Sequence, residues 1–283
     1  MRPSTLNIRI FLDSGDPDDT KKYIDLLGFL DGQTTNPSLV AKKLKANNEN
    51  IKLDTNELNE AYKKIIQEIS PLVPESVSIE VYGDKDTPAD QMIAQGREMN
   101  TWVQNAHIKL PTTMAGLKAA KTLTKEGIRV NMTLIFSQEQ AAAVHAATLG
   151  APKGSVYLSP FVGRLDDKGQ DGISLIKNIA DMYKKADSHV EILTASLRNF
   201  DHFFGAIAAG THLITSPAKV LDEWAQNNMQ PPNEQYVYNA KGLSPIPYQQ
   251  LDLTKHYSEY NLKHDLTDVG LQKFADDWNN LIG

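Results

Sequence analysis

Lys109 is the residue whose surroundings in the sequence most clearly suggest chemistry. It stands in a short apolar run at residues 106–110, and a turn and a helical pattern at 114–123 follow directly. A buried strand is an unfavourable place for an ammonium ion, because desolvation disfavours the charged form. A lysine kept there extends its charged end to solvent, pairs with an acid, or acts as a nucleophile toward a carbonyl group. Exposed or paired lysines dominate in general, so the spacing alone leaves these alternatives open.

Polar residues also end several other apolar runs. They are Asp13, Asn36, Glu80, Asn131, Thr133 and Ser159, with Ser196 just beyond its run. One polar residue at a strand end is ordinary. The carboxyl ends of parallel strands in a barrel meet at one mouth, where the chemistry of such folds takes place. A set drawn from separate strands therefore predicts one shared site.

The residue types in this set fit imine chemistry on a keto sugar. Lys109, placed beside two carboxylates, can form an imine whose nitrogen accepts electrons when a carbon–carbon bond breaks. Asp13 is suited to move a sugar hydroxyl proton as a general acid/base. Glu80 and Thr133 can hold a water that carries protons during imine formation. Asp13 as a turn cap and Glu80 as a plain ion-pair partner are the ordinary interpretations of the same residues.

Two asparagines and two arginines extend the predicted site. Asn36 and Asn131 can orient sugar hydroxyls or the lysine itself. Arg164 and Arg198 follow the sixth and seventh apolar runs, close to where barrels often bind phosphate. Paired guanidinium groups suit a phosphate dianion, although the two arginines taken alone also fit surface salt bridges.

Eight short strand patterns alternate with helical patterns along the chain. The strands are expected at 8–12, 29–35, 76–82, 106–110, 129–133, 155–159, 190–194 and 212–215. Helices are expected at 18–28, 38–44, 57–69, 87–103, 114–123, 137–149, 172–186 and 216–225, with a loop at 160–164. This alternation predicts parallel β/α units and an α/β fold, most economically a closed (β/α)8 TIM barrel. An open doubly wound sheet is the alternative, but no Gly-rich phosphate fingerprint follows any strand.

Composition narrows the class of protein. The chain of 283 residues carries 29 basic and 35 acidic residues, a net charge of -6, and no basic run, which argues against a nucleic-acid partner. It has no cysteine, so disulfides, thiolate metal sites and thiol nucleophiles are excluded. The seven histidines form no HExxH-like pair, so no metal site is expected. The chain has neither the apolar core of a signal peptide nor an apolar run of transmembrane length, so we expect a cytoplasmic protein that does not bind membranes.

Two segments fall outside the barrel pattern. Residues 45–55 are polar and Asn-rich, and we expect a surface excursion there. From residue 229 the pattern breaks into Pro, Asn, Gln and Tyr, and it ends in an amphipathic segment at 265–281. We therefore divide the chain into a barrel at 1–228 and a C-terminal extension at 229–283. The terminal helix is expected to pack on the barrel or on a neighbouring subunit, which leaves a homo-oligomer open.

Seven stretches carry a resemblance to a known family. FLDS, TTNPSL, SIEV, IKLP, VNMTLIFS, SPFVGR and TASLRN occur in this order between residues 8 and 225, and they resemble the transaldolase family of Schiff-base-forming barrel enzymes. The resemblance implies that Lys109 forms the Schiff base and that Asp13 is the acid/base. It also implies that Glu80 and Thr133 position catalytic water. The substrate- and phosphate-binding positions that it implies are Thr35, Asn36, Asn131, Ser159, Phe161, Arg164, Ser196 and Arg198.

The family implies a reaction without a cofactor. A dihydroxyacetone unit moves from sedoheptulose 7-phosphate or fructose 6-phosphate to glyceraldehyde 3-phosphate or erythrose 4-phosphate, in the pentose phosphate pathway. The family also contains fructose 6-phosphate aldolases, which release dihydroxyacetone and carry glutamine in place of Glu80 and tyrosine in place of Phe161. Both positions favour the transferase here. A third alternative is a sugar-phosphate-binding barrel without catalysis, against which stands the complete catalytic set.

Overall fold

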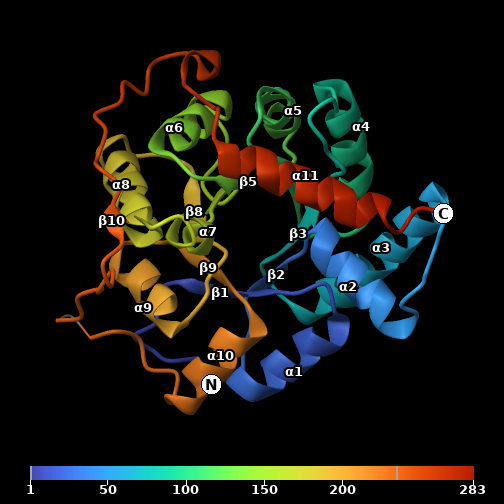
Figure 1. Cartoon of the computed structure of the whole chain (residues 1–283), viewed down its shortest axis with the longest axis horizontal. Coiled ribbons are helices and arrows are strands. Elements are labelled where there is room, and N and C mark those ends of the chain that lie inside the picture. Colours follow the sequence, from blue (N-terminus) through green and yellow to red (C-terminus); the bar gives the residue numbers. More distant parts are fainter. Residues whose placement is uncertain (1, 234) are drawn as a thin grey trace.

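The computed structural model of the chain describes residues 2–233 and 235–283, with the side chain of Asn47 left out. Its strands close into a parallel barrel in the order β1-β2-β3-β4-β5-β6-β8-β9, and helices surround it (Figure 1). Strand β1 pairs with β2 on one side and with β9 on the other, which closes the sheet and excludes the open alternative. The predicted α/β fold, a (β/α)8 TIM barrel, is confirmed.

Each short barrel strand is followed by at least one helix. The barrel strands are β1 (Arg9–Asp13), β2 (Gly32–Thr34), β3 (Ser76–Glu80), β4 (Ala106–Pro111), β5 (Val130–Ile135), β6 (Val156–Pro160), β8 (Glu191–Thr194) and β9 (Leu213–Ser216). The helices are α1 (Pro17–Leu27), α2 (Pro37–Asn47), α3 (Thr55–Ile69), α4 (Ala89–Asn100), α5 (Met114–Lys125), α6 (Gln138–Ala147), α7 (Val162–Asp166), α8 (Gly172–Lys185), α9 (Phe200–Ala208), α10 (Ala218–Gln226) and α11 (Asp265–Asn279). Short elements outside the barrel are η1 (Ser70–Leu72), β7 (Gln170–Asp171), β10 (Ser244–Pro245) and η2 (Tyr257–Glu259). In the described ranges, no helix is both long and apolar enough to cross a membrane.

Local capping explains where the first helices begin. The side chain of Asp16 accepts a hydrogen bond from the backbone of Asp18 ahead of α1, and Asn36 accepts one from Leu39 ahead of α2. A proline follows each cap, at a position whose N–H has no partner within the helix. Asn36 therefore ends the connection from β2 and starts α2 at one point, which fixes its side chain at the carboxyl mouth of the barrel.

Two local predictions need correction, and one helix was missed. Residues 160–164 do not form a loop, because Val162–Asp166 form α7, which is too short to show a helical period in the sequence. Helix α9 was not predicted, because its nine residues are too few to establish a helical period, although Asn199 caps its first turn. The second strand spans only Gly32–Thr34, since the chain leaves α1 at the left-handed Gly28 (φ 74°) and uses residues 29–31 to reach the barrel.

The barrel interior is filled in layers. Phe11, Tyr157, Leu193 and Leu213 form a buried cluster of their own inside the barrel. The imidazole of His107 stacks on Tyr157, with ring centroids 4.0 Å apart. Side chains alternate along a strand, so residue 109, two positions further along β4, also faces the interior, closer to the carboxyl end. Aromatic and apolar groups thus close the amino end, and the lysine lies above them.

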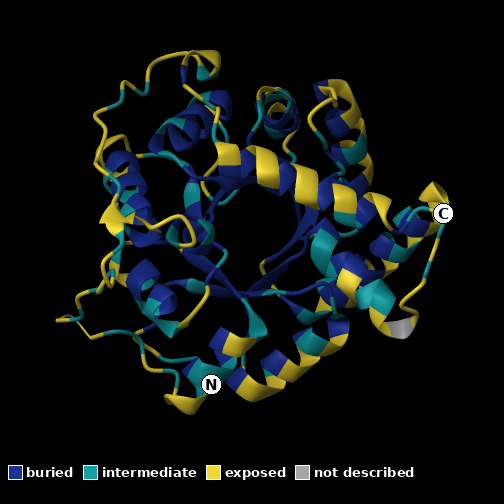
Figure 2. Cartoon of the chain, viewed as in Figure 1, coloured by how far each residue is buried: buried dark blue, intermediate teal, exposed yellow. Residues whose placement is uncertain are grey.

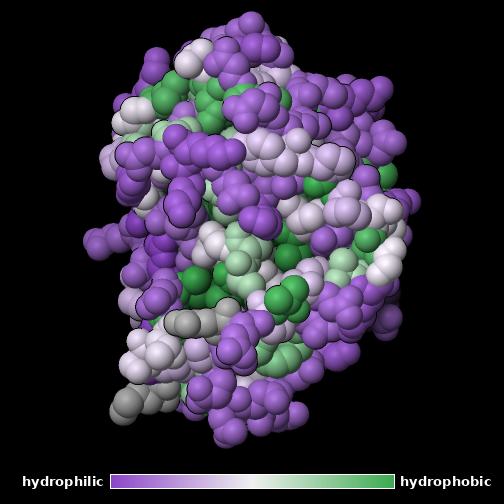
Figure 3. Space-filling model, turned by 90° about the vertical axis from the view of Figure 1, so that its left-hand side faces the viewer, coloured by the Kyte–Doolittle hydropathy of each residue, from purple (hydrophilic) through white to green (hydrophobic). Residues whose placement is uncertain are grey.

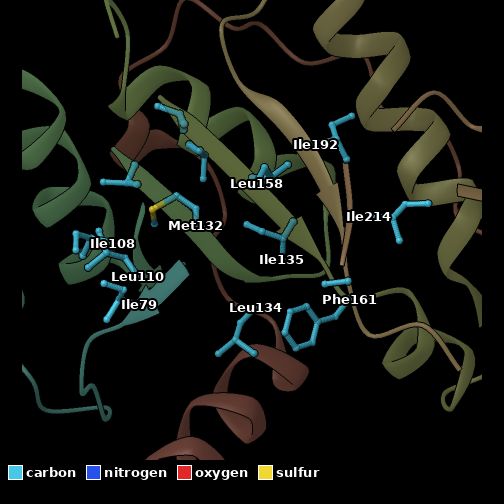
Figure 4. Close-up of a cluster of buried hydrophobic side chains, with 14 of the residues drawn as sticks. Ile79, Ile108, Leu110, Met132, Leu134, Ile135, Leu158, Phe161, Ile192 and Ile214 are labelled. Atoms are coloured by element: carbon cyan, nitrogen blue, oxygen red, sulfur yellow. The ribbon is translucent and has the colours of Figure 1, made fainter. Parts of the chain in front are cut away.

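A second and larger core lies between the strands and the surrounding helices. Figure 4 shows part of it, with side chains such as Ile108, Leu158 and Ile192 from β4, β6 and β8. Leu134 and Phe161 differ from these, because they lie at the carboxyl end and point toward α11 (Figure 4). The core therefore continues from the barrel to the C-terminal helix.

The segment after α10 runs along the outside of the molecule before it forms α11. It passes α9, α8 and α6 (Figure 1) and is held by hydrogen bonds. Asn178 on α8 donates to the carbonyl of Ile246 at 2.7 Å, and the side chain of Gln138 on α6 accepts from the backbone of Gln249 at 2.7 Å. The side of the molecule that carries this segment is largely hydrophilic, with separate hydrophobic groups (Figure 3).

Helix α11 crosses the carboxyl mouth of the barrel of its own chain (Figure 1). Its outer face is exposed and its inner face is buried (Figure 2). Phe274 and Trp278 on the inner face belong to the same buried cluster as the barrel strands. The division of the chain at residues 228 and 229 stays a prediction.

The Asn-rich segment and the C-terminus meet at one edge of the barrel. Leu53 and Ile282 form a parallel bridge, and the backbone of Leu53 donates to the carbonyl of Leu281 at 2.8 Å. The ammonium group of Lys52 donates to the carbonyls of Asn280 and Ile282 at 3.2 and 3.1 Å. The end of this segment therefore holds the end of α11, and only part of residues 45–55 is a free surface excursion.

His107 makes the stability of the barrel depend on pH. Its Nε2 lies 3.0 Å from the carbonyl of Gly154 and its Nδ1 lies 2.7 Å from the hydroxyl of Ser76, so the neutral ring donates through Nε2 and accepts through Nδ1. Burial lowers the pKa of His107 from 6.5 to about 3. The unfolded chain therefore takes up a proton at a higher pH than the folded chain, and the free energy of unfolding falls as the pH drops from 6.5 toward 3.

We expect His107→Gln to lower the free energy of unfolding at pH 7.5, because stacking on Tyr157 is lost. The free energy of unfolding of this variant should also fall less in acid than that of the wild type. At pH 5 the histidine should account for about 2 kcal/mol of the wild-type decline. Urea unfolding of both proteins at pH 7.5, 6 and 5 measures this difference. Parallel declines would show that the folded protein already carries a charged imidazole at position 107.

Candidate active site

Lys109 and Glu80 form a buried ion pair at the carboxyl end of the barrel. They are register neighbours on β4 and β3, and Lys109 Nζ lies 2.9 Å from Glu80 Oε2. Each side chain is only 4% exposed. Burial raises the pKa of Glu80, and the positive charge of Lys109 opposes that rise. The pair places an amine beside a carboxylate that is unusually ready to take up a proton.

The backbone and α3 hold this pair in position. Lys109 Nζ donates to the carbonyl of Thr35 at 3.1 Å. The hydroxyl of Tyr62 on α3 accepts from the backbone N–H of Glu80 at 2.9 Å and lies 2.7 Å from the hydroxyl of Thr35. Trp278 of α11 packs edge-on against Tyr62, with ring centroids 5.6 Å apart. Thr35 thus contributes its carbonyl to the lysine, while its hydroxyl is used in hydrogen bonds with Tyr62 and the carbonyl of Ser78.

Asp13 stands at the end of β1, on the floor of a cavity that it shares with Lys109. Its Oδ1 accepts from the hydroxyl of Thr34 at 2.8 Å, and Thr34 lies 2.6 Å from the hydroxyl of Thr215. Burial raises the pKa of Asp13, whereas the charge of Lys109 and the hydrogen bond from Thr34 oppose the rise. The hydrogen bond through Oδ1 leaves the other carboxylate oxygen for a substrate proton.

Asn131 and Thr133 lie on β5, next to the strand of the lysine. Asn131 is the register neighbour of Lys109; it donates to Ser78 at 3.0 Å and accepts from Ser159 at 2.7 Å. The buried hydroxyl of Thr133 has no hydrogen-bond partner within the described part of the chain. An unpaired buried hydroxyl is unusual in a folded protein and is available to a ligand or a water.

The two predicted arginines lie beyond Lys109 toward the rim. The guanidinium of Arg164 lies between two aromatic rings, 5.1 Å from the centroid of Phe161 and 5.7 Å from that of Phe274. Arg198 pairs with Asp167 at 2.6 Å, so the salt-bridge interpretation also holds for it. Burial and the charge of Arg198 lower the pKa of Arg164, which shows that two like charges share this region.

The loop that carries Arg198 approaches α7 very closely. Ser196 adopts a left-handed conformation (φ 60°), and its carbonyl accepts from the backbone of Gly163 at 3.0 Å. A Cβ at Gly163 would lie 2.3 Å from that carbonyl and 2.6 Å from Arg198 Cγ. Glycine at position 163 therefore lets the two arginine-bearing segments lie side by side.

A cavity of about 240 Å³ joins these groups. Of the residues predicted from the sequence, it is lined by Asp13, Asn36, Lys109, Ser159, Phe161, Arg164, Ser196 and Arg198. Glu80, Thr133, Thr35 and Asn131 are not among the lining residues and support the wall from behind. One end holds the amine and the carboxylate, and the other is cationic, which suits a carbonyl compound with an anionic tail.

Sequence reasoning missed several residues of this cavity. Thr34 is the last residue of β2, and Thr215 is the next to last residue of β9. Like Asp13, they lie at the carboxyl ends of barrel strands and line the cavity. Lys273 and Phe274 of α11 could not be found by that rule, because they come from a helix outside the barrel. Lys109 Nζ lies 5.9 Å from the ring centroid of Phe274, so α11 contacts both ends of the cavity.

No group of three or more metal-binding side chains gathers in residues 2–233 and 235–283. The functional groups that line the cavity are two amines, a carboxylate, hydroxyls, an amide and two guanidinium groups, and the carboxylate of Glu80 pairs with Lys109 from behind the wall. The chemistry that they offer directly is nucleophilic attack, proton transfer and anion binding.

Comparison with known proteins gives one consistent result. A family model described as Transaldolase/Fructose-6-phosphate aldolase matches residues 10–283. A protein named probable transaldolase from Herpetosiphon aurantiacus is 34% identical over 274 residues, which are 97% of this chain and 96% of that protein. Probable transaldolase 2 from Bacillus cereus is 37% identical over 96% of this chain and 97% of its own. Probable transaldolase 1 from Listeria monocytogenes is 36% identical over 96% of this chain and 98% of its own. The chain belongs to the transaldolase/fructose-6-phosphate aldolase family.

Proposed function

We propose that this protein is a transaldolase of the pentose phosphate pathway, in the cytoplasm. It takes a dihydroxyacetone unit from sedoheptulose 7-phosphate or fructose 6-phosphate and transfers it to glyceraldehyde 3-phosphate or erythrose 4-phosphate. The observation that carries the proposal is the buried Lys109–Glu80 pair at the floor of a cavity whose rim is cationic.

Imine formation begins with loss of a proton from Lys109. Glu80, 2.9 Å away and with a raised pKa, is the nearest carboxylate to accept it. The free amine attacks the ketone carbon, and the resulting carbinolamine must lose water. The unpaired hydroxyl of Thr133 can hold that water, with Glu80 relaying protons.

Cleavage between the third and fourth sugar carbons requires removal of the proton from the C4 hydroxyl. Asp13 lines the cavity beside Lys109, and burial raises its pKa, which favours uptake of this proton. The electrons of the breaking bond move to the imine nitrogen and leave a three-carbon enamine on Lys109. The aldose phosphate departs, and an incoming aldose phosphate is attacked by the enamine in the reverse sequence.

Arg164, Arg198 and Ser196 bind the phosphate in this proposal. They line the same cavity as Lys109 and Asp13, and guanidinium groups favour a phosphate dianion. Asn36, Ser159 and Phe161 complete the contacts with the sugar chain, and Asn131, behind the cavity wall, orients Ser159 by accepting its hydroxyl hydrogen bond. Binding at a fixed distance from the lysine would select phosphorylated ketoses and present the carbonyl to the amine.

The competing function is a fructose 6-phosphate aldolase that releases dihydroxyacetone. Glu80 and Phe161 are the positions that favour transfer, since the aldolases resembled by this chain carry glutamine and tyrosine there. An assay with fructose 6-phosphate alone separates the two functions. Steady consumption of the ketose without any aldose acceptor would establish the aldolase, and consumption that needs an acceptor would establish the transferase.

The first prediction is that borohydride traps a substrate on Lys109. Incubation with fructose 6-phosphate and borohydride, followed by peptide mass mapping, should give a reduced three-carbon adduct on the peptide containing Lys109. Lys109→Met should give no adduct and no turnover, because the nucleophile is absent. Lys43→Met is a matched control, since Lys43 is also a partly buried lysine paired with an acid, Asp16, at 2.7 Å. An adduct on another lysine, or none on the folded protein, would refute the proposed mechanism.

The second prediction concerns Asp13→Asn, which keeps an oxygen for the hydrogen bond from Thr34. Turnover should fall by about 10²–10⁴-fold, because the general acid/base is lost. Imine formation should persist, so borohydride should trap the uncleaved six-carbon sugar on Lys109. A three-carbon adduct in this variant would show that another group removes the C4 hydroxyl proton.

The same variant should be more stable than the wild type near neutral pH. The pKa of Asp13 is raised in the folded state, so ionisation of the carboxyl destabilises the fold as the pH rises through that pKa. Replacement by a neutral amide should raise the free energy of unfolding at pH 7.5 and change it little in acid, where Asp13 is protonated in both states. Chemical unfolding at both pH values measures the effect, and an equal change at the two would contradict it.

A further inference from the structure

One face of α11 is aimed at the proposed phosphate end of the cavity. Gly270, Lys273, Phe274 and Asp277 are spaced three or four residues apart and therefore share that face. A Cβ at Gly270 would lie 2.5 Å from Arg164 Nη1, so the helix backbone rests against this guanidinium. The ring of Phe274 contacts the same guanidinium and the ammonium of Lys109. Lys273 lies between these two contacts along the helix.

Lys273 lines the cavity together with Arg164 and Arg198. Its ammonium pairs with Asp277, at 2.9 Å from Oδ2 and 3.2 Å from Oδ1. The side chain is 60% exposed, so it is free to move between its carboxylate and the cavity. Asp277 also accepts a hydrogen bond from Ser38 on α2, which keeps the carboxylate at the rim.

The outer cations of the cavity share one arrangement. Arg198 pairs with Asp167 and Lys273 pairs with Asp277, and all four side chains are at least one-quarter exposed. Arg164, by contrast, lies between two rings. A dianion that enters beside Arg164 would meet two further cations, each held by a single carboxylate that it can replace.

We propose that Lys273 is a third cation of the phosphate subsite and that Asp277 is a resident counterion which competes with the phosphate. When phosphate binds, the ammonium leaves Asp277 and contacts the phosphate, while Asp277 keeps its hydrogen bond from Ser38. The assignment of this phosphate to a ketose or aldose rests on the proposed function; the anion site itself does not.

The alternative is that Lys273 and Asp277 form an ordinary ion pair on the surface of a helix. Lys177 and Asp181 on α8 form such a pair, with the same spacing, a distance of 3.0 Å and a lysine exposure of 66%. They lie away from the cavity lined by Lys273 and provide matched controls. If Lys273 and Asp277 only stabilise their helix, replacing either one should act in the same direction.

The experiment is calorimetric titration with inorganic phosphate at low salt, on the full chain and four variants. Lys273→Gln should raise the Kd by about 3–10-fold, since one charge-assisted contact is lost. Asp277→Asn keeps an oxygen for Ser38 but removes the competitor, so it should lower the Kd by about 2–5-fold. Lys177→Gln and Asp181→Asn should leave the Kd unchanged. Opposite shifts for Lys273→Gln and Asp277→Asn support the proposal; no shift in Lys273→Gln, or weaker binding in both variants, overturns it.

Kinetics give an independent readout. Lys273→Gln should raise the KM for fructose 6-phosphate by about the same factor with kcat little changed, because uniform binding is lost. Borohydride trapping of dihydroxyacetone, which has no phosphate, should be unaffected by this variant. If the wild type formed no adduct while the phosphate shifts were observed, the proposed function would fail and the Lys273 site would stand. If the wild type formed the borohydride adduct but the phosphate Kd did not shift in the variants, the proposed function would stand and the Lys273 site would fail.

Discussion

The buried ion pair between Lys109 and Glu80 is the constraint on which the rest of the site depends. Two charges removed from water are costly, and the fold keeps them only because each has a close partner and the lysine also reaches the carbonyl of Thr35. Tyr62 fixes the backbone of Glu80, and Trp278 packs against Tyr62, so the terminal helix contributes to the geometry of the pair. The site is therefore built from both ends of the chain, and a buried ion pair of this kind is weak evidence of a gain in stability.

Asp13 extends this conflict between stability and function. Its raised pKa means that the folded protein holds a carboxylate where a neutral group would be more stable. The hydrogen-bonded threonines, Thr34 and Thr215, reduce that cost without neutralising the acid. At the closed amino end of the barrel the same low-dielectric environment keeps His107 neutral, and its ring packs against Tyr157. Similar burial thus yields a structural group at one end of the barrel and a reactive group at the other.

The fold and most of the cavity could be predicted from the sequence, because both follow from the alternation of strands and helices. Once the strands are parallel and closed, their carboxyl ends must meet, so Asp13, Lys109 and Ser159 come together without further information. Helix α9 was harder to predict, because its nine residues make too few turns to establish a clear helical period in the sequence. The proposed role of Lys273 could not be predicted either, because the sequence does not indicate which surface of the barrel the terminal helix covers.

The place of α11 is set by contacts at both ends of the helix and along its inner face. The bridge between Leu53 and Ile282 fixes one end. The Asn-rich segment lies outside the strand–helix pattern, and this bridge gives its last residues a structural role. Gly270 lets the helix backbone lie against Arg164, because the side chain of any other residue at this position would clash with the guanidinium group. A helix that could shift along the mouth would move Phe274 away from Lys109 and Arg164 together. Tight attachment of α11 therefore matters for the proposed reaction, in which the enamine would need a wall that limits access of water while leaving an entrance for the second sugar.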